Sequence, residues 1–148
     1  MDLVKINIQL FKKEAKMPQK QTSGSAGYDL YAALESKVII DPGQTVLIPL
    51  GFKTSFSEDY VALIFARSGT AIKHGCAPAN KVGVIESDYR GEWIVALHNH
   101  GKESFAEEPG DRIAQVLFIR KLSAAFVTTG ELDDTERGEG GFNSTGVK

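Results

Sequence analysis

Short apolar segments with a period of two, separated by turn residues, constrain the fold of this chain more than any other feature. Residues 4–10 alternate between apolar and polar side chains, as a strand with one buried face does. A second apolar run, residues 38–40, leads into Asp41, Pro42 and Gly43, which form a strong turn signal. Because such segments recur at short intervals, the sequence predicts an all-β barrel or sandwich.

The same pattern predicts the individual elements and the domain organisation. We expect strands over residues 4–10, 38–40, 45–52, 60–65, 82–85, 92–99 and 112–119, with a weaker pattern over 125–129. Only residues 66–74 have the character of a short helix. The 148 residues suffice for one domain with a core, without an internal repeat or linker. We predict a β-rich domain over residues 1–135 and a mobile, glycine-rich arm over residues 136–148.

Composition and charge limit the kinds of partner. Hydrophobic residues make up 42% of the chain and charged residues 24%, as in soluble globular proteins. The formal net charge of −2 argues against a nucleic-acid duplex or an anionic membrane as partner. An anionic ligand would have to be bound by local cations and backbone amides.

Cysteine usage indicates the compartment. The single cysteine, Cys76, excludes an intrachain disulfide and favours a reducing, cytoplasmic compartment. The alternating N-terminal segment lacks the apolar region of a signal peptide, and no apolar run approaches the length of a membrane span. We therefore expect a cytoplasmic protein in which Cys76 is a small buried residue.

Residues 83–91 bring several chemically active groups together. Two carboxylates, Glu86 and Asp88, and the ring of Tyr89 lie between two glycines. A strand-like run, residues 93–97, follows, so the segment predicts a β-hairpin with reactive groups at its tip. A carboxylate can take a proton from water, and a ring can cover a base or a sugar. The alternative is an ordinary solvated hairpin loop.

The glycine-rich segment 137–146 also carries groups that suit an anionic ligand. It combines Arg137 with Phe142, two hydroxyl side chains and free backbone amides. Consecutive amides of this kind form anion-binding concavities, and an arginine matches phosphate oxygens. The alternative is a disordered terminus.

Three further segments have weaker signals. Residues 66–71 follow a predicted strand and can begin a helix, where Arg67 and Ser68 would add donors for an anion. A helix cap explains Ser68 equally well. The other two segments are residues 25–30 and 110–115, in which Asp29 and Asp111 can simply accept hydrogen bonds from backbone amides of a loop.

Taken in order, these five segments resemble the five motifs of the homotrimeric dUTPase (deoxyuridine triphosphatase) family. The matching residues are 26–30, 66–69, 83–91, 110–115 and 137–146. They extend from about residue 22 to residue 146, in the order and at the intervals usual in the family. A single motif would be weak, but five in order are specific.

The resemblance implies a fold, an assembly and a reaction. Family members have β-rich, distorted jelly-roll (β-clip barrel) subunits that form a homotrimer with three active sites. Each site draws on all three subunits, and the C-terminal arm closes over a neighbouring site. The reaction converts dUTP to dUMP and pyrophosphate by attack of water at the α-phosphate, with Mg²⁺ on the triphosphate. It supplies dUMP for thymidylate synthesis and keeps uracil out of DNA.

The resemblance also implies residue roles by position. Uracil would be read mainly by backbone groups of residues 80–89, and Tyr89 would stack on the deoxyribose. The residues that would hold uracil are Asn80, Gly83, Val84 and Ile85. Those that would act on the phosphates and the attacking water are Arg67, Ser68, Gly69 and Gln115. Phe142 would cover the base, and the γ-phosphate end would be bound by Arg137, Asn143, Ser144 and Thr145. Magnesium would be held by the substrate phosphates, with Asp29 acting through metal-bound water or by supporting the site.

Two positions depart from the family pattern. The family usually has aspartate where this chain has Glu86, the base that would activate water, and glycine where it has Asn143. Glutamate has a similar unperturbed pKa (about 4.3 against 3.9), so the extra methylene matters more than acidity. A displacement of about 1 Å can cost on the order of 10²-fold in rate. Three explanations of Glu86 stay open. It is a competent base with an adjusted backbone, a natural change that weakens catalysis, or a deliberate substitution that traps a substrate complex. Asp88 is a second candidate base.

Other functions compete with dUTP hydrolysis. A dCTP deaminase resembles this fold and also uses a glutamate, although Tyr89 and the Ser68–Gly69 pair favour the uracil hydrolase. A weakly active or inactive nucleotide-binding, regulatory protein would explain Glu86. A zinc hydrolase lacks support, because His74, His98 and His100 have no metal-site spacing.

Overall fold

Antiparallel strands form nearly all of the regular structure of this chain. In the computed structural model, which describes residues 3–142, the regular elements are β1 (Asn7–Leu10), β2 (Tyr28–Tyr31), β3 (Val38–Ile40), β4 (Thr45–Pro49), β5 (Phe52–Ser55), β6 (Tyr60–Ala66), α1 (Ser68–His74), β7 (Cys76–Pro78), β8 (Gly83–Ile85), β9 (Ile94–Asn99), β10 (Phe105–Glu107) and β11 (Arg112–Arg120). No helix within residues 3–142 has the length and apolar character needed to cross a membrane.

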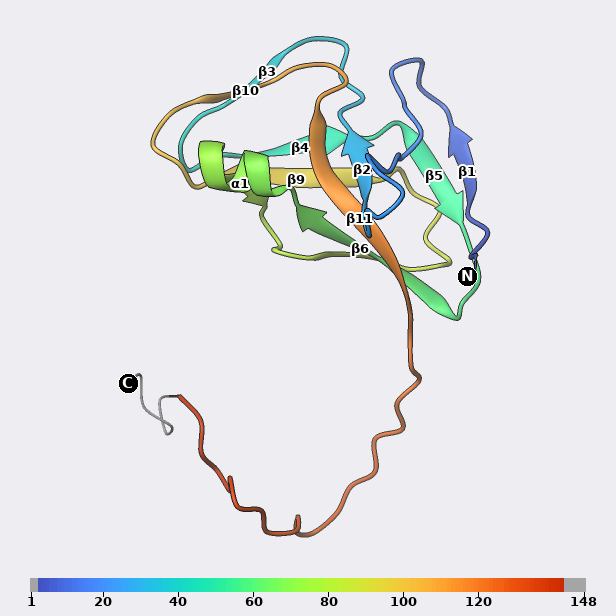
Figure 1. Cartoon of the computed structure of the whole chain (residues 1–148), viewed down its shortest axis with the longest axis vertical. Coiled ribbons are helices and arrows are strands. Elements are labelled where there is room, and N and C mark those ends of the chain that lie inside the picture. The colour runs from blue at the N-terminus through green and yellow to red at the C-terminus, as the bar shows by residue number, and fades with distance from the viewer. Residues whose placement is uncertain (1–2, 143–148) are drawn as a thin grey trace.

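The strands form four small sheets, which confirms the predicted all-β class. The largest has the order β2-β11-β6-β8, and a three-stranded sheet has the order β4-β9-β7. The pairs β1-β5 and β10-β3 complete the body, and all pairings are antiparallel. The sheets wrap around a common core in a jelly-roll-like arrangement without closing into a barrel (Figure 1).

The core lies between the two larger sheets and has Trp93 near its centre. Trp93 is almost fully buried, and its ring lies 5.2 Å from that of Phe52, centroid to centroid. Its indole Nε1 donates to Thr54 Oγ1 at 3.0 Å, so the polar atom is satisfied. Cys76 is buried as predicted, and this burial raises the pKa of its thiol. Each large apolar side chain in such a core contributes roughly 1.5–3 kcal/mol.

The observed strands agree with the prediction where the alternation is long. The predicted strand 45–52 is broken into β4 and β5 because Gly51 has φ +73° and packs against Ala15. The short strands β2, β7 and β10 carry too little pattern to be predicted. The predicted strand 125–129 is wrong, because this segment forms no sheet and the side chain of Phe126 is 98% exposed.

The predicted hairpin around residues 83–91 is also wrong. β8 pairs with β6, whereas β9 pairs with β4 and β7, so residues 86–93 cross from one sheet to another. The cause lies at Trp93, whose N–H donates to Phe52 O at 3.0 Å and whose carbonyl accepts from Leu50 N at 2.9 Å. These bonds and the buried indole fix the chain against the β4–β5 turn before β9 begins.

The segment after β11 leaves the body of the fold. It contains no helix or strand up to residue 142 and runs away from the sheets (Figure 1). Its large apolar side chains are all highly exposed: Leu122, Phe126, Val127, Leu132 and Phe142. The domain boundary placed after residue 135 stays a prediction.

A buried carboxyl group on β10 was not predicted from the sequence. Glu107 is 1% exposed, and its Oε2 has no hydrogen-bond partner among the described residues. Desolvation by burial, with a smaller contribution from Asp111, raises the pKa of Glu107 to about 8. At pH 7, below this pKa, the neutral, protonated form of the side chain predominates.

Replacing Glu107 with glutamine should change how stability depends on pH. In the unfolded chain the carboxyl has its ordinary pKa of 4.5, so between pH 4.5 and about 8 unfolding releases a proton. The unchanged chain must therefore lose stability as pH rises through this window. Glu107→Gln keeps the shape of the neutral acid but cannot ionise. We expect its gain in Tm to be small at pH 5 and largest at pH 8 and above, measured by circular dichroism at fixed protein concentration. The exposed-site control, Glu35→Gln, should show no such trend. A gain independent of pH would contradict a buried, protonated Glu107.

Candidate functional site

A pocket of about 620 Å³ lies where β2, β6 and β11 meet the start of α1. It brings together three of the five predicted segments, residues 25–30, 66–71 and 110–115. The predicted site residues that line it are Asp29, Arg67, Ser68, Gly69 and Gln115. The other lining residues are Gln21, Ser25, Ala26, Gly27, Phe65 and Leu117. The predicted residues thus share one hollow whose walls are partly polar and partly apolar.

The turn from β6 into α1 presents Arg67 and Ser68 to this pocket. Arg67 keeps an extended backbone (φ −87°, ψ 134°) and occupies the N-cap position, without a side-chain cap hydrogen bond. The alternative prediction that Ser68 caps the helix is therefore wrong. Ser68 is the first helical residue, and its exposed hydroxyl has no partner among the described residues. It is free to donate to a ligand.

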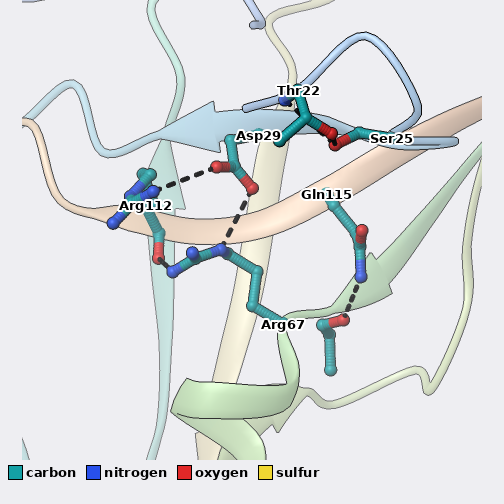
Figure 2. A network of polar contacts seen from close by, with 7 residues as sticks. Thr22, Ser25, Asp29, Arg67, Arg112 and Gln115 are labelled. Atoms are coloured by element: carbon teal, nitrogen blue, oxygen red, sulfur yellow. Dashed lines mark hydrogen bonds and ion pairs between the residues drawn. The ribbon is translucent and has the colours of Figure 1, made fainter. Parts of the chain in front are cut away.

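A carboxylate between two arginines forms the polar centre of the site (Figure 2). Asp29 Oδ1 accepts from Arg67 Nε at 3.0 Å, and Arg112 Nη1 lies 3.5 Å from Asp29 Oδ2. Arg67 Nη1 also donates to the Arg112 carbonyl at 3.2 Å. Asp29 is 7% exposed, so the two cations compensate the cost of burying its charge. The group holds two positive charges and one negative charge.

Gln115 is held by a backbone carbonyl and by close packing. Its Nε2 donates to Ala66 O at 3.0 Å (Figure 2). On the other side Gly27 lies so close that a Cβ there would be 2.6 Å from Gln115 Oε1. The loop before Gly27 is fixed by Thr22 and Ser25, whose hydroxyl oxygens lie 3.0 Å apart. The carboxamide therefore faces the pocket in one orientation.

The predicted base and sugar-stacking residue lie elsewhere. Neither Glu86 nor Tyr89 lines the pocket, and both are exposed. The Tyr89 hydroxyl donates to Glu92 O at 3.0 Å, and its ring lies over Gly91, where a Cβ would collide with it. Arg90 Nη1 donates to Ser87 O at 2.8 Å and to Thr54 O at 3.3 Å. The loop is thus well braced but offers no enclosed site of its own.

The predicted uracil residues lie along β8 and the turn before it. Gly83 is buried, and a Cβ there would be 3.1 Å from Ile64 Cβ. Asn80 and Val84 are exposed, and Ile85 is half-buried. None of these residues lines the pocket. Within one described chain, the two groups of predicted site residues are separate.

The predicted arm residues also lie apart from the pocket. Arg137 Nε donates to Gly140 O at 3.0 Å, and the side chain of Phe142 is fully exposed. Both belong to the segment that leaves the body (Figure 1). The remaining arm residues lie outside the described residues: Asn143, Ser144 and Thr145.

Sequence reasoning missed the part that Arg112 plays. Arg112 is the first residue of β11 and is followed by the apolar residues of that strand. The preceding residue, Asp111, accepts a hydrogen bond from Glu108 N at its Oδ2, as predicted for a loop aspartate. The available signal was a cation at a strand start within the matched segment 110–115. Among residues 3–142, no group of three His, Cys, Asp or Glu side chains is placed to hold a metal ion. His98 and His100 contact each other, with ring centroids 4.3 Å apart.

Comparison with known proteins gives a consistent result. A sequence model of the family described as dUTPase matches residues 13–146. A deoxyuridine 5'-triphosphate nucleotidohydrolase of Desulfitobacterium hafniense is 48% identical over 150 residues, covering 99% of each chain. The protein of that name from Shigella flexneri serotype 5b is 42% identical and covers 97% of this chain and 95% of its own.

Solved structures agree with the sequence comparison. A Staphylococcus bacteriophage 80alpha dUTPase with dUPNHPP has a TM-score of 0.88 and 26% identity, and covers 97% of this chain and 99% of its own. A mutant dUTPase from phage phi11 of S. aureus, described with a structural Mg(II) ion, shares the fold at a TM-score of 0.79, 20% identity and coverages of 88% and 99%.

The packing of Gly27 against Gln115 can be tested without a ligand. In Gly27→Ala the added methyl must displace the carboxamide, because 2.6 Å is far inside van der Waals contact. We expect the NMR signals of the Gln115 side-chain amide to shift and unfolding to cost about 1–3 kcal/mol less. Gly24→Ala is the matched control, since nothing lies within 4 Å of a Cβ there. Unchanged Gln115 signals in Gly27→Ala would show that the carboxamide is not held in this way.

Proposed function

The chain belongs to the dUTPase family, and we propose that its 620 Å³ pocket binds the triphosphate of dUTP while a second copy supplies the base-reading loop. It is a dUTP diphosphatase that releases dUMP and pyrophosphate. The observation that carries the placement is the pocket itself, where Arg67, Ser68 and Gln115 converge. Such a local set of donors can bind a polyanion although the net charge is −2.

The separation of the two groups of residues supports a shared site in a homotrimer. The pocket has phosphate-binding side chains but no free carboxylate that could act as the base, because Asp29 is paired with arginines. The loop with Glu86 and Tyr89 has the opposite composition and is exposed. In a closed ring of copies, the loop of one chain meets the pocket of the next. The exposed apolar residues after β11 would be covered in the same assembly, with Phe142 and Arg137 reaching a neighbouring site.

The proposed chemistry uses residues from both groups. Glu86 takes a proton from a water molecule, whose oxygen attacks the α-phosphorus. A new P–O bond forms as the bond to the α,β-bridging oxygen breaks, and pyrophosphate leaves with that oxygen. The Ser68 hydroxyl donates where negative charge develops on the bridge. Gln115 and Gly69 hold the phosphates, and Tyr89 stacks on the deoxyribose.

The uracil specificity is assigned to the backbone of β8 and its preceding turn. Asn80, Gly83, Val84 and Ile85 would hold the base by main-chain donors and acceptors that match its edge. The close packing of Gly83 on Ile64 leaves the strand little freedom to widen. A thymine methyl would then be excluded by shape. Cytosine would be excluded because its donors and acceptors do not match.

The side chains present fit a magnesium ion carried by the substrate. Mg²⁺ prefers phosphate and water oxygens in octahedral geometry, and the described residues form no protein cage for it. Bound to the phosphates, it would neutralise part of their charge. Asp29 Oδ1 accepts from Arg67 and Oδ2 is buried beside Arg112, so Asp29 would support the site through these arginines. The single buried Cys76 agrees with a reducing, cytoplasmic compartment.

The alternatives differ in support. A dCTP deaminase is not favoured, since the curated relatives at 40–48% identity are named as nucleotidohydrolases of dUTP. A weakly active or regulatory nucleotide-binding form has one observation in its favour, the longer side chain at Glu86. It differs from an efficient enzyme in turnover rather than in substrate.

Release of pyrophosphate from dUTP with Mg²⁺ tests the function. We expect turnover of dUTP, no pyrophosphate from dTTP and no ammonia from dCTP. Glu86→Gln removes the base and should lower kcat by about 10²-fold or more. Glu86→Asp measures the effect of the extra methylene: a much faster aspartate form would identify this chain as a weakened or trapped hydrolase. Release of ammonia from dCTP would refute the assignment. So would the absence of pyrophosphate release from dUTP in both the unmodified chain and Glu86→Asp.

Complementation tests whether the site is shared. Glu86→Gln keeps an intact pocket and Arg67→Ala keeps an intact loop, so each alone should be poorly active. After joint refolding of equal amounts, each site combines the pocket of one chain with the loop of another, and each of these is intact in half of the chains. Both are therefore intact at about a quarter of the sites in randomly assembled trimers. We expect about a quarter of the unmodified activity to return. No recovery, with trimers verified by sedimentation, would place the complete site within one chain.

A further inference from the structure

We propose that Arg112 is a positioning residue, which holds the guanidinium of Arg67 in place for the phosphates through Asp29 and its own carbonyl. The inference rests on the proposed function of the pocket and deepens it. Arg112 does not line the pocket. It lines a neighbouring hollow of about 330 Å³ together with Lys73. That hollow shares Arg67 and Gly69 with the pocket, and we assign the influence of Arg112 on the phosphates to its contacts with Asp29 and Arg67.

Arg67 is fixed at two of its three nitrogens. Nε donates to Asp29 Oδ1 at 3.0 Å, and Nη1 donates to Arg112 O at 3.2 Å (Figure 2). Nη2 has no partner among the described residues, and Arg67 is a wall of the pocket. Two bonds of different direction leave the planar fork only one orientation, so Nη2 is the donor left for a phosphate oxygen.

Arg112 controls both of these anchoring groups. Its carbonyl is the acceptor for Arg67 Nη1, and its guanidinium lies 3.5 Å from Asp29 Oδ2. That oxygen is buried and has no hydrogen bond from any described residue. Without the second cation, Asp29 would keep one buried, uncompensated oxygen and could rotate away from Arg67.

A register shift at the start of β11 makes this double contact possible. β11 pairs with β2 through Arg112 opposite Tyr31 and Ala114 opposite Leu30, which leaves Ile113 as an extra residue. Such a β-bulge re-aims neighbouring side chains and carbonyls. Ile113 is buried in the core, so the shift is held in place by packing.

Charge and position have to be separated experimentally, because removing Arg112 also removes a positive charge. Lys73 provides the matched control: it lines the same hollow and carries the same charge, but it makes no hydrogen bond or ion pair with Asp29. Arg112→Gln and Lys73→Gln thus lower the local charge equally, and only the first removes the contact to Asp29.

The experiment compares kcat and KM for dUTP in the full-length assembled protein, together with hydrogen exchange of the Arg67 Nε–H by NMR. We expect Arg112→Gln to lower kcat about tenfold or more, since small misplacements of a binding group are costly. Lys73→Gln should change kcat less than about twofold. All variants at this position keep the backbone carbonyl; Arg112→Lys also keeps the charge but not the fork, and should recover part of the loss. In Arg112→Gln the Arg67 Nε–H should exchange faster.

The possible outcomes decide between the explanations. Equal losses in Arg112→Gln and Lys73→Gln would overturn the proposal in favour of a charge effect. An unchanged exchange rate of the Arg67 Nε–H in Arg112→Gln would also overturn the proposal. In an Arg67→Lys background, Arg112→Gln should have little further effect, and full additivity would contradict action through Arg67. The exchange measurement needs no turnover, so it tests the anchoring even if the proposed function fails.

Discussion

The site depends on one buried carboxylate that ties three separate parts of the chain together. Asp29 lies on β2, Arg67 at the end of β6 and Arg112 at the start of β11. Strand pairing alone would leave the ends of these elements free to splay. The ionic contacts join them at the point where the pocket opens, and the burial of Asp29 makes loss of either arginine costly. The same interaction thus stabilises the strand ends and orients Arg67 toward the pocket proposed to bind phosphate.

A second constraint, the burial of Trp93, sets the position of the loop that carries the proposed base, Glu86. By fixing the chain against the β4–β5 turn, it directs residues 86–93 from one sheet to another and keeps Glu86 away from the pocket. The fold therefore separates the residues proposed to bind phosphate from those proposed to read the base. Under the proposed function, a neighbouring chain completes the site, and the exposed segment after β11 is available to contact that neighbour.

Much of the fold could be predicted from the sequence, because alternation over five or more residues reports burial directly. β6, β9 and β11 were found in this way, and the motif segments around Arg67 and Gln115 do converge. The hairpin failed because the partner of a strand depends on distant contacts, here those of Trp93. β2, β7 and β10 were missed because they are short and carry no apolar run like those of β3 and β8. Glu107 and the link from Arg112 to Asp29 are visible only once the chain is folded, since no local pattern marks a buried acid or a bulge.

The exposed apolar side chains after β11 have a consequence for how the protein is made. The segment from Leu122 to Leu132 follows every strand of the body in chain order, so it emerges from the ribosome after them. The earlier strands are thus available first to fill the core, which limits competition from these side chains. The time that they spend uncovered then depends on how quickly a newly made chain meets another, which makes the level of expression itself a factor in solubility.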